Sequence, residues 1–260
     1  MTRYEAIFRR KSVRKYRKEE VDEAILEKIR NFGPDTVGVR PDIPVKWRIY
    51  KGSDHKVKGL FQVKAPYYAA LYSEVCGDGQ TNGGCLMEQL VLYLHTLGIG
   101  SCYQGSAKLR EEAEDGMELL MILAFGYPDE PLERKKTDFK RAELKKLVKT
   151  TGPVNRQLRG LLEPARLAPS ALNQQPWRFA VSENRIHLFV KRPGRVGYQR
   201  QLGKSMFHAG IVLSHMLIAG EEHWLDLEYQ KLGSIMEKAI QNYLYIGSLT
   251  VAALSQGGKI

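Results

Sequence analysis

The chain has 260 residues, 43% of them hydrophobic, with a mean hydropathy of −0.36, which allows a core in one large domain or two small ones. No apolar run approaches the length of a membrane span, and the first residues lack the apolar segment of a secretory signal. The three cysteines, Cys76, Cys85 and Cys102, form no C-x-x-C pair, so neither a disulfide framework nor a zinc site is expected. We therefore expect a reduced, cytoplasmic protein with no metal and no membrane partner.

The net charge of +11 is the unusual bulk property, because it favours a polyanionic partner. The basic residues are nevertheless scattered among 29 acidic residues, and no basic cluster alternates with aromatic residues. Two concentrations, Arg9–Lys18 and Arg134–Lys149, are explained by a small phosphorylated ligand and by solvated helix faces. We therefore expect no nucleic-acid partner; steep salt-dependent binding would be the sign of one.

The first 150 residues show a series of helix and strand patterns. Apolar spacing predicts helices at Tyr4–Arg10, at Asp22–Arg30 with a stop at Gly33-Pro34, at Cys85–Leu97 with Asn82 as the cap, and at Glu143–Lys149. Apolar and aromatic runs predict strands at Val45–Lys51, Tyr67–Tyr72 and Leu119–Phe125.

A turn-forming cluster, Thr150–Pro153, separates this part from one that repeats its order. The second part is predicted to contain a helix at Leu158–Leu167, strands at Trp177–Val181 and Arg185–Val190, a long helix at Phe207–Gly220, and another helix at Ile235–Tyr245. The first four of these parallel a helix, two strands and the long helix of the first part. We therefore predict two related halves, 1–150 and 151–260, packed as an internal pseudo-dimer.

The loop Ala168–Trp177 carries uncharged hydrogen-bonding side chains between two prolines. Pro169 and Pro176 restrict the backbone, so the loop is stiff. Its side chains Ser170, Asn173, Gln174 and Gln175 offer donors and acceptors without charge, which suits the edge of a flat polar heterocycle. Composition alone favours an ordinary turn before a strand, so the functional interpretation depends on other segments.

Two segments of the first half add to this picture. Arg10, Ser12 and Arg14 occupy alternating positions on one side of an extended segment, and arginine and serine suit a phosphate, although a solvated basic face is the alternative. Three glycines between Gly98 and Gly105 allow the backbone to approach a flat ligand closely, where a helix end alone needs one.

Together these segments resemble the nitroreductase family, in particular single-chain nitroreductases made of two fused, shortened halves. The family is usually homodimeric, with FMN at the interface, and its motifs match Arg9–Tyr16, Gly98–Tyr103, Gly126–Pro128, Lys140-Arg141 and Ala168–Trp177. The last motif is missing from the first half and present in the second. The second half in turn lacks the basic segment and the glycine-rich helix end, so the resemblance implies one complete FMN site per chain.

The resemblance implies an α+β, nitroreductase-like fold with mixed, mostly antiparallel sheets flanked by helices. It also implies an FMN-dependent oxidoreductase that passes hydride from NADH or NADPH to FMN and on to a nitroaromatic, quinone or similar electrophile. A small-molecule electron acceptor would be the partner, and the pseudo-dimer would be a monomer. The alternative is an FMN-binding carrier or redox sensor with little turnover, because a fold does not fix a function.

The same resemblance implies the residues of the site. Arg9, Arg10 and Ser12, with Lys140 and Arg141, would hold the phosphate and ribityl chain, although Arg134, Lys135 and Lys136 compete with the last two. Arg14 would lie near flavin N1 and O2, and the segment Tyr103, Gln104 and Gly105 would present backbone N–H groups near N5 and O4. The loop residues Pro169, Ser170, Ala171 and Asn173 would cover the isoalloxazine ring and bond its edge.

Overall fold

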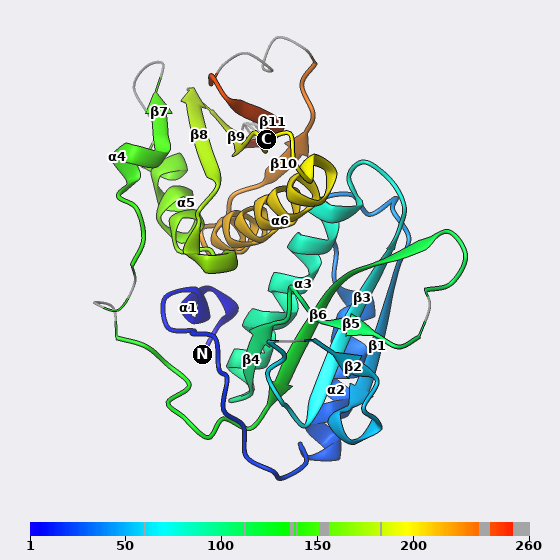
Figure 1. Cartoon of the computed structure of the whole chain (residues 1–260). Coiled ribbons are helices and arrows are strands. Elements are labelled where there is room, and N and C mark those ends of the chain that lie inside the picture. The colour runs from blue at the N-terminus through cyan, green and yellow to red at the C-terminus, as the bar shows by residue number, and fades with distance from the viewer. Residues whose placement is uncertain are drawn as a thin grey trace, which may run out of the picture.

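Strand-forming segments pair into two main sheets in the computed structural model, which describes residues 1–59, 61–111, 113–135, 138, 140–150, 156–182, 184–233 and 240–251. The first sheet has the order β1-β3-β6-β4 and comprises β1 (Val45–Lys51), β3 (Tyr67–Glu74), β6 (Met117–Gly126) and β4 (Gly100–Tyr103) (Figure 1). The second has the order β10-β11-β9-β8-β7 and comprises β10 (Leu227–Gln230), β11 (Tyr243–Val251), β9 (Arg185–Lys191), β8 (Trp177–Ser182) and β7 (Val148–Thr150). Of these pairs only β7 with β8 is parallel, so the predicted α+β class with mixed, mostly antiparallel sheets is confirmed.

The central strand β3 pairs with β1 and β6, and its side chains alternate between two faces that are both buried. Tyr67, Ala69 and Leu71 belong to the main core, with side chains of α3 (Gly79–Thr96). The alternate residues face smaller clusters near the short strands β2 (Val57–Lys58) and β5 (Lys108–Leu109). This double burial explains why the segment reads as a continuous apolar run.

The long helices α3 and α6 (Tyr198–Glu222) cross each other between the two sheets (Figure 1). A Cβ on Gly84 would lie 2.0 Å from the carbonyl oxygen of Phe207, and one on Gly210 would lie 2.0 Å from the carbonyl oxygen of Thr81. Each glycine therefore faces the residue three positions before the other glycine. That reciprocal pattern is the one that a twofold axis produces at a dimer interface.

Shorter helices complete the fold and join its two parts. They are α1 (Arg3–Ile7), α2 (Glu23–Asp35), α4 (Leu144–Leu147), α5 (Arg156–Arg166) and the 3-10 turns η1 (Gly52–Asp54) and η3 (Ala171–Asn173). A capping box between Thr2 and Glu5 starts α1, as its sequence allows. Ala6 and Ile7 of α1 then pack in one cluster with Leu92 of α3 and Ile218 of α6.

Two predicted helix ends are wrong. The helix α2 continues through Gly33 and Pro34 to Asp35, where Gly33 lies against the Trp47 ring and a Cβ would come within 3.0 Å of it. The long helix α3 begins at Gly79, so Asn82 lies inside it. The side chain of Asn82 accepts a hydrogen bond from the backbone of Arg40 instead of capping the helix.

Two expectations about the second part need correction or fall outside the described residues. Within the predicted helix Ile235–Tyr245, residues 234–239 are not described, and Tyr243–Tyr245 belong to strand β11. Residues 151–153 of the predicted boundary also lie outside the described chain. The 1–150 and 151–260 division therefore stays a prediction.

The expectation that no segment could span a membrane also needs correction. By length and composition α6 is long and apolar enough to do so. Most of its apolar stretch is buried inside the structure, where it packs on α3 and α5. It is a core helix.

Candidate functional site

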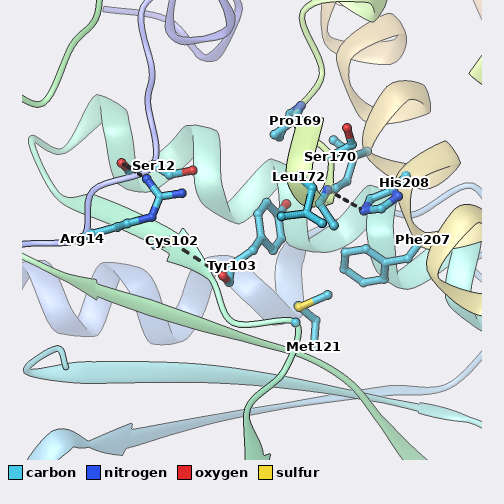
Figure 2. A pocket seen from close by; sticks show the side chains of 13 residues that line it. Ser12, Arg14, Cys102, Tyr103, Met121, Pro169, Ser170, Leu172, Phe207 and His208 are labelled. Atoms are coloured by element: carbon cyan, nitrogen blue, oxygen red, sulfur yellow. Dashed lines mark hydrogen bonds between the residues drawn. The ribbon is translucent and has the colours of Figure 1, made fainter. Parts of the chain in front are cut away.

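A cavity of about 210 Å³ lies between residues of the two parts of the chain (Figure 2). From the first part it is lined by Ser12, Arg14, Cys102, Tyr103, Gly105 and Met121. From the second part it is lined by Pro169, Ser170, Ala171, Leu172, Phe207, His208 and Ile211. The extended segment that carries Ser12 and Arg14, the end of β4, the strand β6, the η3 loop and the helix α6 therefore meet at one place.

Many of the residues expected in the site line this cavity, namely Ser12, Arg14, Tyr103, Gly105, Pro169, Ser170 and Ala171. The other expected residues do not line it, namely Arg9, Arg10, Gln104, Lys140, Arg141 and Asn173. The sequence did not single out Cys102, Met121, Leu172, Phe207, His208 and Ile211. Most of these sit in apolar strands or helices, where nothing in their pattern distinguishes a cavity wall from a core.

The basic segment lies extended beside β4. Val13 donates its backbone N–H to the Ser101 carbonyl at 2.9 Å, and Ser12 forms a parallel bridge with Ser101. Glu130 holds the neighbouring backbone, because its carboxylate accepts from the N–H of Arg14 at 2.6 Å. This places Ser12 and Arg14 on the cavity wall two residues apart, as their alternation predicted.

Three arginines lie near one another, and one of them contacts Ser12. The Arg10 side chain is buried (3% exposed) and donates to the Ser12 hydroxyl at 3.4 Å. Arg134 follows Glu133, which bridges to Arg10, so the two arginines lie on adjacent strand-like segments. Burial, and then the positive charge of Arg10, lower the pKa of both Arg134 and Arg141. The repulsion among these arginines shows that positive charge is concentrated here. Arg134 is one of them, and the sequence had offered it only as an alternative to Lys140 and Arg141 for holding a phosphate.

The remaining predicted phosphate ligands are placed differently. Arg9 is half-exposed and forms an ion pair with Glu133 at 3.7 Å. Lys140 is exposed, and its carbonyl oxygen accepts from the Asn173 side chain at 2.6 Å. Asn173 also accepts from Arg141 at 2.6 Å, so it fixes the arginine segment to the loop and does not reach the cavity.

The role expected for Gln104 is wrong. Its backbone N–H donates to the carbonyl oxygen of Ile122 at 2.8 Å, and this bond occupies the group that was expected to face a ligand. Its side chain is buried, accepts from Val63 and donates to the Cys102 carbonyl. Gln104 is therefore a structural residue, whereas its neighbour Gly105 lines the cavity.

The proline-bounded loop is held in a strained backbone conformation. Leu172, Asn173 and Gln175 have φ values of 50°, 54° and 48°, in the left-handed region that costs a non-glycine residue about 1–2 kcal/mol. Ser170 supports the loop by accepting from the N–H of Gln175 at 2.9 Å. The strain presents Leu172 to the cavity with 93% of its surface exposed.

Two polar side chains of the cavity wall have fixed protonation. Burial, and then the charge of Lys204, lower the pKa of His208 to about 4, and its Nε2 accepts from the Ala171 N–H at 3.1 Å. Burial and the nearby Glu88 carboxylate raise the pKa of Tyr103 well above its usual value, and its hydroxyl donates to Glu88 at 2.6 Å. At neutral pH the imidazole and the phenol are therefore both uncharged.

The chain is similar in structure to a "putative nitroreductase" of Thermotoga maritima MSB8, with a TM-score of 0.66 and 22% identity over 96% of this chain and 93% of that one. It is also similar to a nitroreductase family protein of Clostridium difficile 630, with a TM-score of 0.49 and 21% identity over 56% of this chain and 96% of that one. A further similar structure is an FMN-dependent nitroreductase of Clostridium difficile R20291, with a TM-score of 0.43 and 18% identity over 53% of this chain and 96% of that one.

No curated protein matches the chain. Residues 2–220 match the family described as "Putative TM nitroreductase", which is well over half of the sequence. The fold is the one that the sequence predicted, because the Thermotoga maritima structure aligns over nearly the whole chain. The chain therefore belongs to the "Putative TM nitroreductase" family and has its α+β, nitroreductase-like fold.

Proposed function

We propose that the protein is an FMN-dependent oxidoreductase that takes hydride from NADH or NADPH and passes electrons to a nitroaromatic, quinone or similar electrophile. The observation that carries this proposal is an arginine group, the buried Arg10 with the half-buried Arg134 and Arg141, near a cavity with polar and apolar walls. Positive charges that lie close together and partly out of water favour the binding of an anion. A phosphate monoester attached to a flat ring system would supply such an anion, with its ring reaching the cavity.

The residues present fit FMN. Arg10, Arg134 and Arg141, with the Ser12 hydroxyl, form a donor set for its phosphate, since guanidinium groups bind phosphate through paired hydrogen bonds. Flat apolar contact would come from Met121, Leu172 and Phe207, which line the cavity. When bound, FMN supplies the hydride-accepting chemistry, so the protein needs no nucleophile of its own.

Arg14 is the cavity residue best suited to tune the reaction. Its side chain lies on the cavity wall, where the guanidinium donates to the Ser12 carbonyl at 3.5 Å (Figure 2). A positive charge fixed there would favour the negative charge that the ring gains on reduction. Cys102 plays no nucleophilic part in this proposal, because burial raises the pKa of its thiol and keeps it protonated.

The proposal includes the division into halves 1–150 and 151–260, with one site between them. Support comes from the reciprocal contact of Gly84 and Gly210 and from a cavity wall to which both parts contribute. In a homodimer two such sites would form. Here the arginine group belongs to residues 10–141 and the proline-bounded loop to the second half, so one chain supplies one complete set.

An anaerobic reduction tests the function. Protein loaded with FMN should lose its visible flavin absorbance when NADPH or NADH is added without oxygen. Adding a quinone or a nitroaromatic compound should restore the absorbance, and repeated cycles should consume the donor in stoichiometric amounts. Bound flavin that neither nicotinamide reduces would contradict the proposal and favour a carrier or sensor.

A further inference from the structure

A second and larger cavity, of about 540 Å³, adjoins the first. The two share Ala171, Leu172 and His208, so they meet at the η3 loop and the amino-terminal half of α6. Figure 2 shows Leu172 and His208 close together on the side of the first cavity that the second half supplies. A long ligand could therefore occupy both cavities at once.

The second cavity is basic. Lys191, Arg192 and Lys204 line it, and none of its described lining residues is acidic. No ion pair joins any of these three cations to a described residue. Their charges are thus available to an anionic ligand, and Gln174 and Ser205 add neutral polar groups.

The backbone that carries two of these cations is fixed. The N–H of Lys191 donates to the Pro176 carbonyl at 2.8 Å, and the N–H of Arg192 donates to the Asn242 carbonyl at 2.9 Å. Lys204 lies on α6, one turn before His208. The cations therefore stand on a rigid rim, unlike lysines on a loose surface loop.

The junction between the cavities carries the strained Leu172. Leu172 has a φ of 50°, and 93% of its surface is exposed. Its side chain therefore gains little burial among the described residues to offset the backbone strain. Backbone strain of this kind is concentrated at ligand-binding loops. An apolar side chain presented there suits contact with a ring that passes from one cavity to the other.

We propose that the second cavity binds the phosphate-bearing arm of the nicotinamide dinucleotide whose ring enters the first cavity. This inference rests on the function proposed above. The dinucleotide carries a pyrophosphate, and NADPH a further phosphate, so its arm is long and strongly anionic. Lys191, Arg192 and Lys204 match that charge, and Leu172 contacts the molecule between its two ends.

A comparison of two hydride donors tests this inference. A variant with Lys191→Ala, Arg192→Ala and Lys204→Ala is compared with a control of equal charge, Lys28→Ala, Lys146→Ala and Lys149→Ala, whose exposed lysines line neither cavity. NADPH is one donor, and 1-benzyl-1,4-dihydronicotinamide, which has no phosphate, is the other. The cavity variant should raise KM for NADPH about tenfold. Its KM for the benzyl donor and the control's KM for NADPH should change less than about twofold.

Three results would overturn the inference. One is an unchanged KM for NADPH, and another is an equal rise for both donors. The third is a raised KM only for an anionic acceptor such as a nitrobenzoate, which would assign the cavity to the acceptor.

Calorimetric titration with NADP⁺ separates this inference from the proposed function. If no donor reduces the flavin, the proposed function fails. Binding of NADP⁺ that the cavity variant weakens and the control does not would still support the dinucleotide site. Equal binding by both variants, or none by the unmodified protein, would overturn it.

Discussion

Glu88 of α3 and His215 of α6 face each other at 3.0 Å, with 0% and 1% of their side chains exposed. His215 Nδ1 lies 2.8 Å from the Pro164 carbonyl oxygen, which only accepts, so Nδ1 carries a proton. The other oxygen of Glu88 accepts from the Tyr103 hydroxyl. Glu88 and His215 Nε2 therefore share one further proton, and the chain of bonds joins the cavity wall to both central helices.

Replacement of Glu88 should distinguish charge from geometry. Glu88→Ala leaves His215 and Tyr103 without their buried partner and should lower the free energy of unfolding by about 3–5 kcal/mol. Glu88→Gln keeps an acceptor for Tyr103 and a donor for a neutral His215, so it should cost about 1 kcal/mol. Urea denaturation of the two variants measures the difference. Equal losses would show that the pair does not hold the helices together.

The close crossing of α3 and α6 gives a second prediction. Gly84→Ala places a methyl group against the backbone of Phe207 and should destabilise the protein by about 1–3 kcal/mol. Gly77→Ala is the matched control, because a Cβ there meets nothing within 4 Å. Thermal denaturation should show a lower Tm for the first variant alone. Similar Tm values would mean that the helices separate without cost.

Arg14 gives a third prediction, on the rate of reduction. Arg14→Ala removes the cation from the cavity wall and should slow hydride transfer to bound FMN about tenfold to a hundredfold. Lys15→Ala, at the next position and outside the cavity lining, should leave the rate nearly unchanged. Stopped-flow absorbance with a single turnover of NADPH measures both. An unaltered rate in the first variant would refute the role.

The buried Arg10 gives a fourth prediction, on the binding of the FMN phosphate. Arg10→Gln should weaken FMN binding about tenfold to a hundredfold, since it removes a charged donor from the phosphate. Riboflavin has no phosphate, so its weaker binding should be the same in the variant and in the unmodified protein. Fluorescence titration with the two flavins makes this comparison. An equal loss for both would place the effect in the fold and not at a phosphate.

Local patterns in the sequence predicted those features that depend on neighbouring residues. The strand Val45–Lys51 has the bounds expected from its alternation, and the spacing of Ser12 and Arg14 placed both on one wall. The sequence did not predict which distant strands pair. That pairing uses the backbone N–H of Gln104, which donates to the carbonyl of Ile122. Phe207 and Ile211 belong to an apolar helix, whose periodicity is that of any core helix.

The hydrogen-bond partners of the amide-rich loop were also not predictable from its composition. Its composition suggested side chains aimed at a ligand, yet Asn173 bonds Lys140 and Arg141, and Gln175 accepts from Ala142. Polar side chains near a strained backbone often satisfy the backbone first. The loop therefore contributes its rigid shape and the exposed Leu172, which no polar pattern indicated.

The number of FMN molecules bound per chain tests the central claim most directly. Purified protein saturated with FMN, freed of excess flavin and assayed for flavin and protein by absorbance, should contain one FMN per chain. The two halves would then supply a single site, with the arginines on one side and the proline-bounded loop on the other. A ratio of two would contradict the complementary halves, and the absence of bound flavin would contradict the assignment of the cavity.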